Sequence, residues 1–235
     1  MLDRVVSAAS HEQACARVAS LFPSRWLSSY VRSKLRSDPA FPIAWELLSA
    51  STQPVLDVGC GVGLLAFYLR ARGSTQAIIG VDIDRRKIDR ALATAAQHEI
   101  HGVDFIASDV AIKLPPFTGN VVVFDVLHYM SPPQQQRLLL ALAALVSPGA
   151  SLLLRDCPRD GSARFWTTYA AETFAQTIAW NWRVPLHFPT AESINDAFAA
   201  SKFQRDVRCA WGRTPFNNRL FTFVRRHFEA APPTE

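Results

Sequence analysis

Short apolar runs alternate with longer amphipathic segments over residues 54–157. Five of the short runs are mostly β-branched and lie between turn signals, which predicts strands, and three longer segments between them predict helices. This alternation predicts a doubly wound α/β fold with a mostly parallel sheet covered on both faces. The predicted strands are Val55–Val58, Ala77–Val81, Val103–Ile106, Val121–Val126 and Ser151–Arg155, and the predicted helices are Leu64–Arg72, Arg85–His98 and Pro132–Val146.

The first 50 residues have a helical pattern of a different kind. Leu27, Val31 and Leu35 recur at helical spacing, while basic residues such as Arg32 are placed to face elsewhere. We expect this basic amphipathic segment to pack against the main domain as a cap or lid. Contact with a lipid surface or a partner is the alternative interpretation.

After residue 156 the alternation stops. Residues 160–190 contain seven of the 25 aromatic residues in the chain, about twice the average density. A helix is predicted after Thr190, and the two closing segments Asp206–Trp211 and Arg219–Arg225 predict an antiparallel strand pair. We therefore expect a helical N-terminal part over 1–50, one domain over 51–228 with an aromatic-rich insertion at about 160–190, and a flexible tail over 229–235.

The composition is that of one folded domain. Hydrophobic residues make up 49% of the 235 and charged residues 19%, which excludes disorder across the whole chain. The apolar stretch Leu138–Leu154 is interrupted by Ser147-Pro148-Gly149, so no membrane span is predicted. The N-terminus shows no apolar signal region, and we expect a cytoplasmic protein. The four cysteines lack metal-ligand spacing, so no metal is expected.

The formal net charge of +5 is unevenly distributed. Residues 201–227 contain seven Lys or Arg residues against one Asp. A basic surface attracts nucleic acid, an acidic carrier protein or an anionic small molecule. These cations occur mostly singly along the predicted hairpin and lack the stacked aromatic partners of a single-strand-binding surface. We expect no specific nucleic-acid partner, and the pattern leaves the oligomeric state open.

A glycine turn follows the first predicted strand. Gly59, Gly61 and Gly63 occupy alternate positions, which lets the backbone bend tightly and approach a ligand closely. The fingerprint of dinucleotide-binding proteins needs a further glycine at position 64, where this chain has leucine. The spacing therefore argues against NAD and FAD.

Acidic residues follow the next two strands. A carboxylate at Asp82 can accept hydrogen bonds from both hydroxyls of a ribose. A carboxylate at Asp109 can accept from the exocyclic amino group of adenine, because both strand ends face the crevice at one edge of the sheet. Together with Asp57 in the first strand, these acids favour a nucleotide-like ligand over solvated strand ends.

These motifs together resemble those of the class I S-adenosylmethionine-dependent methyltransferases of the small-molecule type, over residues 50–157. The resemblance is carried by Asp57, the run Gly59-Cys60-Gly61-Val62-Gly63, Asp82, Asp109 and the run Phe124-Asp125-Val126-Leu127-His128-Tyr129. It implies a Rossmann-like, seven-stranded sheet with an antiparallel closing strand. It also implies a cofactor site for S-adenosylmethionine, with S-adenosylhomocysteine as product, made by Asp57, Gly59, Cys60, Gly61, Gly63, Asp82, Ile83, Asp109, Val110, Asp125 and Val126.

The candidate catalytic residues are histidines. His128 follows the fourth predicted strand beside the expected methyl group and is the first candidate for a general base. A histidine in this place can also simply close the crevice and hydrogen-bond to backbone. His187, in the aromatic-rich region, is the second candidate.

The expected function is methyl transfer to a small, apolar or aromatic acceptor, most readily at oxygen, with the acceptor free or held on a carrier protein. The alternatives are an RNA or protein methyltransferase and a module that binds S-adenosylmethionine without turnover. Acceptor-dependent release of S-adenosylhomocysteine would discriminate among them. Residues expected to line the acceptor pocket are Tyr30, Arg32, His128, Tyr129, Trp166, Tyr169, Trp180 and Trp182.

Overall fold

A seven-stranded sheet forms the centre of the computed structural model, which describes residues 9–178, 185–212 and 214–227 and, for residues 175–178, the backbone only. The strand order is β3-β2-β1-β4-β5-β7-β6. The first five strands pair in parallel, and β7 pairs antiparallel with both β5 and β6. The predicted fold is therefore confirmed. The strands are β1 Val55–Val58, β2 Ile78–Asp82, β3 Val103–Ala107, β4 Asn120–Phe124, β5 Ser151–Asp156, β6 Phe203–Cys209 and β7 Arg219–Arg225.

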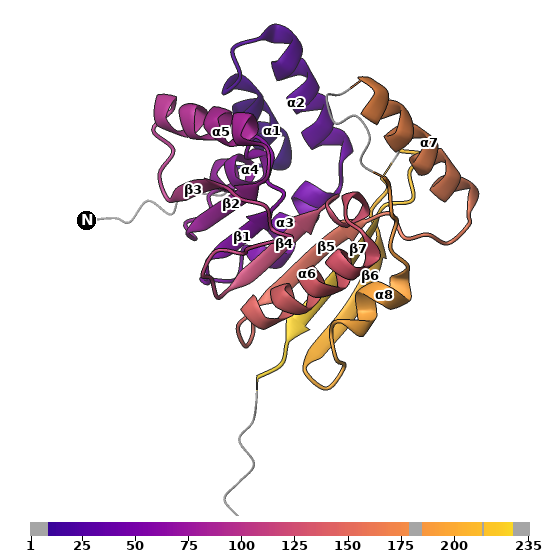
Figure 1. Ribbon diagram of the computed structural model, residues 1–235. Coiled ribbons are helices and arrows are strands. Elements are labelled where there is room, and N and C mark those ends of the chain that lie inside the picture. Colours follow the sequence, from indigo (N-terminus) through magenta and orange to yellow (C-terminus); the bar gives the residue numbers. More distant parts are fainter. Residues whose placement is uncertain (1–8, 179–184, 213, 228–235) are drawn as a thin grey trace, which may run out of the picture.

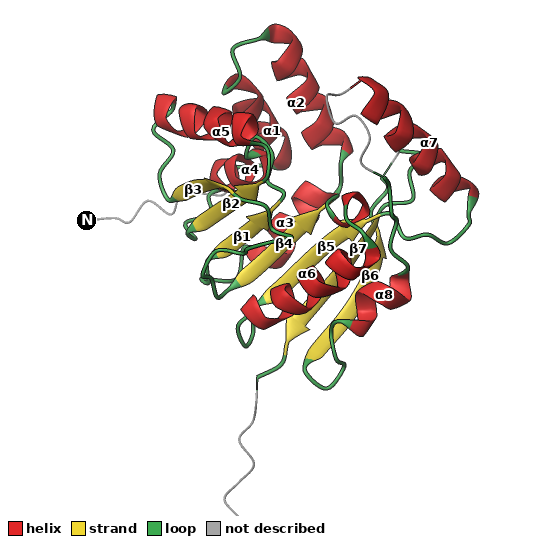
Figure 2. Ribbon diagram, viewed as in Figure 1, coloured by secondary structure: helices red, strands yellow, loops and turns green. Residues whose placement is uncertain are grey.

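Helices cover both faces of this sheet (Figure 1). Figure 2 shows α6 and α8 in front of the strands, while α2 and α7 stand beyond one edge of the sheet. The helices are α1 His11–Ser20, α2 Arg25–Ser37, α3 Ala40–Leu48, α4 Leu64–Arg72, α5 Arg85–Gln97, α6 Pro132–Leu145, α7 Ala163–Ile178 and α8 Ala191–Asp196, with a 3-10 turn, η1, at Leu127–Tyr129.

The two faces of the sheet bury two separate hydrophobic clusters because side chains alternate along a strand. In β5, Leu153 belongs to the cluster under α1 to α5, while Leu152 and Leu154 belong to the cluster under α6 and α8. All three side chains are fully buried. Burial on both faces explains why the central strands are continuous apolar runs in the sequence.

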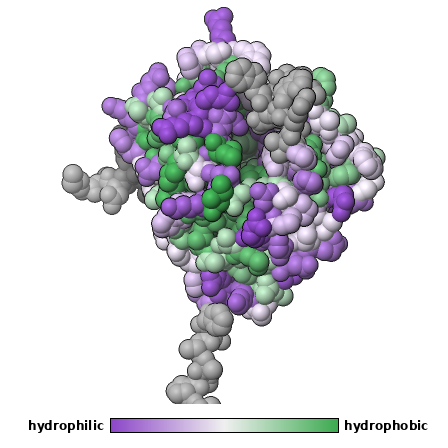
Figure 3. Space-filling model, viewed as in Figure 1, coloured by the Kyte–Doolittle hydropathy of each residue, from purple (hydrophilic) through white to green (hydrophobic). Residues whose placement is uncertain are grey.

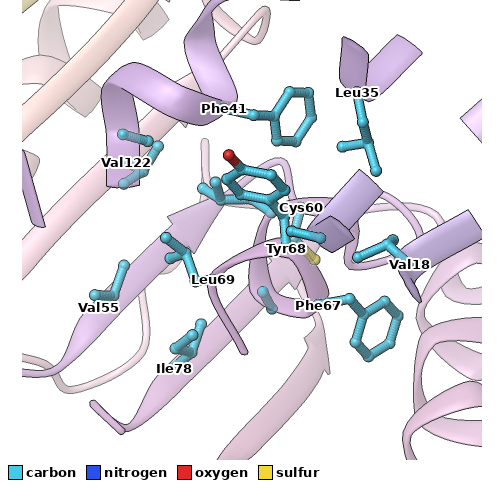
Figure 4. Packing of buried hydrophobic residues seen from close by; sticks show 14 of the residues in the cluster. Val18, Leu35, Phe41, Val55, Cys60, Phe67, Tyr68, Leu69, Ile78 and Val122 are labelled. Atoms are coloured by element: carbon cyan, nitrogen blue, oxygen red, sulfur yellow. The ribbon is translucent and has the colours of Figure 1, made fainter. Parts of the chain in front are cut away.

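The N-terminal helices belong to the first of these clusters. Val18 of α1, Leu35 of α2 and Phe41 of α3 pack in one core with Tyr68 of α4 (Figure 4). The rings of Phe41 and Tyr68 meet edge to face, with their centroids 5.7 Å apart. The expected packing of this segment against the main domain is confirmed, and its boundary at residue 50 stays a prediction.

Candidate functional site

The glycine turn between β1 and α4 uses all three of its glycines in left-handed backbone, with φ of 77°, 57° and 80° at Gly59, Gly61 and Gly63. A side chain at Gly59 would overlap Val126, and one at Gly63 would come within 2.7 Å of the Phe105 ring. A Cβ atom added at Gly61 would meet no atom of the described residues within 4 Å. Two of the glycines are thus required by packing, whereas Gly61 leaves open space beside the turn.

Asp82 fixes this turn from the end of β2. Its side chain is buried; one carboxylate oxygen accepts from the Gly61 amide at 2.9 Å and the other from the Asp84 amide at 2.8 Å. Each oxygen keeps a second lone pair for a ligand hydroxyl. Asp84 in turn caps α5 by accepting from the Arg86 amide.

Asp57, in β1 just before the glycine turn, has a carboxylate oxygen whose hydrogen-bonding capacity is not satisfied. It is 4% exposed, and its Oδ2 atom has no hydrogen-bond partner among the described residues. Burial, together with the charge of Asp82, raises the pKa of Asp57 to about 7. A buried acceptor without a partner is unfavourable in the free protein, so the site favours a ligand that brings a cationic donor.

Asp109 and Ile83 lie at the neighbouring strand ends, where β2 and β3 pair Asp82 with Ala107. The half-buried Asp109 accepts from the Ala111 amide at 2.9 Å, which keeps the turn containing Val110 in place. Ile83 is 69% exposed, leaving an apolar surface beside the acids. The structure therefore brings the predicted ribose and adenine residues to one edge of the sheet.

The predicted strand Val121–Val126 ends earlier, at Phe124. Asp125 takes a left-handed conformation with φ of 58°, which turns the chain out of the sheet. Its amide donates to the Arg155 carbonyl at 2.9 Å, and its carboxylate pairs with the Arg155 guanidinium. The following Val126 packs against Gly59, so this turn is joined directly to the glycine turn.

His128 is buried in an ion pair with Asp156. Its Nδ1 atom lies 2.9 Å from the Asp156 carboxylate, which also accepts from the Leu127 amide at 3.0 Å. Its Nε2 atom has no partner among the described residues. Burial lowers the pKa of His128, but the charge and hydrogen bond of Asp156, aided by Asp125 and Glu172, outweigh it and raise the pKa to about 9.

His187 has a different environment. Its side chain is exposed, while its amide donates to the His128 carbonyl at 2.8 Å. The backbone of His187 therefore supports the turn that carries His128, and the structure does not bring the second ring into the buried pair.

A series of aromatic rings extends from His128 to α7. The His128 ring stacks on Phe188 with centroids 5.2 Å apart, and Tyr169 lies 5.9 Å from Phe188 and from Trp166. Tyr129 donates to Glu172 of α7 at 3.1 Å. Figure 3 shows hydrophobic side chains gathered beside a hollow near the middle of this face, with hydrophilic side chains around them.

The other residues expected in the acceptor pocket do not belong to this series of aromatic rings. Tyr30 and Arg32 are exposed on α2, and Tyr30 stacks on Trp26 of the same helix at 5.9 Å. Trp180 and Trp182 lie outside the described residues.

Three charged residues of this site were missed in the sequence: Asp38, Arg155 and Asp156. All are buried. A usable signal was present, because Arg155-Asp156 ends an apolar strand in the same way that acids end the other strands.

Comparison with known proteins identifies the domain. Residues 55–149 match the family model described as a methyltransferase domain. Residues 55–149 of this chain form a methyltransferase domain. The resemblance seen in the sequence is thereby confirmed.

The curated proteins with similar sequences include O-methyltransferases of ubiquinone biosynthesis. The ubiquinone biosynthesis O-methyltransferase of Coxiella burnetii (strain RSA 493 / Nine Mile phase I) is 33% identical over 122 residues, which are 50% of this chain and 49% of that protein. The protein of the same name from Klebsiella pneumoniae (strain 342) is 31% identical over 121 residues, 50% of this chain and 48% of that protein. The chain thus spans about half the length of the curated relatives it matches.

A solved structure supports the fold over more of the chain. Magnesium protoporphyrin IX methyltransferase from Synechocystis PCC 6803, crystallised with bound S-adenosylhomocysteine, superimposes with a TM-score of 0.62. It is 18% identical, and the match covers 90% of this chain and 92% of that one. In the part of the chain that the structure describes, no helix is long and apolar enough to cross a membrane, and no group of three or more potential metal ligands is found.

Proposed function

We propose that this protein transfers the methyl group of S-adenosylmethionine to an oxygen atom of a small, mainly apolar or aromatic acceptor. The observation that carries the proposal is the buried His128–Asp156 pair at the same sheet edge as the glycine turn; its Nε2 atom is buried and has no hydrogen-bond partner among the described residues. A hydroxyl acceptor gains from a general base, whereas an amine needs mainly to be unprotonated.

The residues of the glycine turn fit this cofactor. Asp57 and the open space at Gly61 would hold the methionine part, Asp82 the ribose, and Asp109 with Ile83 and Val110 the adenine. Cys60, Gly59 and Gly63 would shape the turn, and Asp125 with Val126 would border the reacting end. When bound, the cofactor supplies an electrophilic methyl group on a sulfonium ion.

His128 would act on the acceptor hydroxyl. Its neutral Nε2 would take the hydroxyl proton as the oxygen forms its bond to the methyl carbon and the carbon–sulfur bond breaks. Asp156, held by the Leu127 amide, would fix the ring orientation and stabilise the imidazolium. Holding the acceptor oxygen about 3 to 3.5 Å from the methyl carbon would supply much of the acceleration.

The aromatic residues of α7 and η1 support an apolar or aromatic acceptor. Tyr129, Trp166 and Tyr169 would line its site, with Tyr30 and Arg32 approaching from α2. Trp180 and Trp182 remain candidates from the sequence and lie outside the described residues. A cytoplasmic location belongs to the proposal as well, with the acceptor either free or held on a carrier protein. The curated relatives are named as O-methyltransferases of ubiquinone biosynthesis. Together with the aromatic side chains of the site, this name favours a phenolic hydroxyl as the acceptor.

Several basic residues of the C-terminal hairpin have partners within the chain, which weakens the RNA alternative. Arg205 donates to the Phe198 carbonyl, Arg208 pairs with Asp206, and Arg225 donates to the Val146 carbonyl. The decisive experiment is release of S-adenosylhomocysteine with a set of phenols, amines and RNA. Release with phenols supports the proposal; methyl incorporation into RNA, or none with any acceptor, contradicts it.

Cofactor binding is expected to depend on the protonation of Asp57. Below the raised pKa of about 7 the carboxyl group is neutral and cannot pair with the cofactor ammonium, so affinity should fall about tenfold per pH unit under that value and level off above it. Calorimetric titration with S-adenosylhomocysteine from about pH 5.5 to 8.5 measures this. Asp57→Asn should abolish the pH dependence of the affinity. Asp109→Asn is the control, because it should weaken binding but leave the pH dependence unchanged. Equal affinity at both ends of the range would contradict the role of Asp57.

Asp82→Ala is expected to weaken S-adenosylhomocysteine binding about ten- to a hundredfold. The substitution removes the ribose acceptor and the hydrogen bond that fixes the Gly61 amide, together about 1.5 to 3 kcal/mol. Asp84→Ala is the matched control, because it removes the cap of α5 but not the fixed glycine turn. Equal losses of affinity in the two folded variants would show that Asp82 acts only through the start of α5.

A further inference from the structure

One buried arginine joins the N-terminal helices to the edge of the sheet. Arg155, at the end of β5, is 3% exposed. Its Nε donates to Asp125 at 3.0 Å, a second guanidinium nitrogen donates to the other oxygen of Asp125, and the third donates to Asp38. The guanidinium also lies 5.1 Å from the Phe124 ring centroid. Two carboxylates separated by 87 positions in the sequence thus share one cation.

Asp38 is the N-terminal end of this connection. It ends α2, and its Oδ1 accepts from the Ala40 amide at 3.0 Å, at the start of α3. On the solvent side, its Oδ2 pairs with Lys34 at 3.0 Å. The corner between α2 and α3 therefore has two cationic partners, one buried in the sheet edge and one half-exposed on its own helix.

Asp125 is the other end. Its side chain is 37% exposed, so it is the accessible member of the three. Its left-handed backbone sets the direction of the turn that continues through Val126, which contacts Gly59, to His128. A displacement of Asp125 would therefore move the residues proposed to border the cofactor and to take the proton.

We propose that Arg155 is a positioning residue that couples the α2–α3 corner to the turn at residues 125–129, so that ligand binding at the turn also orders α2. For the ligand-dependent part, the proposal rests on the proposed function. A guanidinium suits this task because its planar donors hold two carboxylates in fixed directions, which the single ammonium of lysine cannot do.

Hydrogen–deuterium exchange of the protein without ligand tests the coupling first. Asp38→Asn keeps an acceptor for the Ala40 amide but removes the charge, and it should speed exchange in residues 125–129 by about tenfold. Lys34→Gln is the matched control, because it removes the solvent-side partner of the same carboxylate and should leave residues 125–129 unchanged. Faster exchange confined to residues 34–42 in Asp38→Asn would overturn the proposal.

The second arm adds S-adenosylhomocysteine to the wild-type protein and to Arg155→Lys. The ligand should protect residues 125–129 in both proteins but residues 34–42 in the wild type alone. Equal protection of residues 34–42 in both would overturn the coupling. Absence of any ligand binding would instead overturn the proposed function, and the comparison without ligand would then decide the role of Arg155 by itself.

Discussion

Gly61→Leu is expected to reduce affinity for S-adenosylhomocysteine more than about a hundredfold while the protein still folds. A Cβ atom added at this position meets no atom of the described residues within 4 Å, so a side chain there would extend into the space proposed for the ligand. The left-handed backbone costs a non-glycine residue about 1 to 2 kcal/mol, and stability should fall by that amount. Calorimetry and denaturant unfolding measure the two effects separately.

Gly161→Leu is the matched control for this substitution. Gly161 has φ of 70°, and a Cβ atom added there also meets no atom of the described residues within 4 Å, but it lies between β5 and α7 rather than in the glycine turn. Both variants should lose similar stability, and only Gly61→Leu should lose the ligand. Normal binding by Gly61→Leu would place the cofactor elsewhere.

His128→Gln is expected to lower the methylation rate of a phenolic acceptor about 10²- to 10⁴-fold, the usual contribution of a general base. In the wild type, kcat/KM should rise with pH and reach half its maximum near pH 9, because only the neutral ring accepts a proton. His187→Gln is the control, since its exposed ring lies outside the buried pair. A pH profile that keeps its shape in His128→Gln would remove His128 from the base role.

The His128–Asp156 ion pair also makes stability depend on pH, and stability falls with rising pH whereas kcat/KM rises. The folded pKa of His128 lies above the ordinary value of 6.5, so the pair stabilises the fold fully below about pH 6.5, and this contribution is lost as pH rises through about 9. Denaturant unfolding of the wild type should show this loss, and His128→Gln should not. The base would thus become active in the range where its contribution to stability declines.

The sequence predicted the parallel strands well because their two-sided burial leaves unbroken apolar runs. Val55–Val58 and Leu64–Arg72 have the predicted bounds. The edge strand β6 was placed too late, at Asp206–Trp211 rather than Phe203–Cys209, because only Phe203 of its residues is buried and the rest give no apolar pattern. The early end of β4 depends on the backbone of Asp125, which no hydrophobic pattern records.

The residues proposed to bind the cofactor could be grouped from the sequence because they lie at or near the ends of parallel strands, and the topology brings the carboxyl ends of β1 to β5 to one edge. The ion pairs Arg155–Asp38 and His128–Asp156 could not be predicted from the sequence. Arg155 and Asp38 are 117 positions apart, and their contact depends on how α2 packs against the sheet. The partner of His128 likewise comes from a different strand, 28 positions later.

The acidic strand ends have a consequence for turnover. Asp57, Asp82 and Asp109 place negative charge at one edge of a protein whose net charge is +5. S-adenosylmethionine carries one positive charge more than S-adenosylhomocysteine, so this edge would attract the substrate more strongly than the product. Each methyl transfer would then lower the electrostatic attraction between the protein and the product, which favours exchange of S-adenosylhomocysteine for S-adenosylmethionine. Added salt would reduce the difference in affinity between the two.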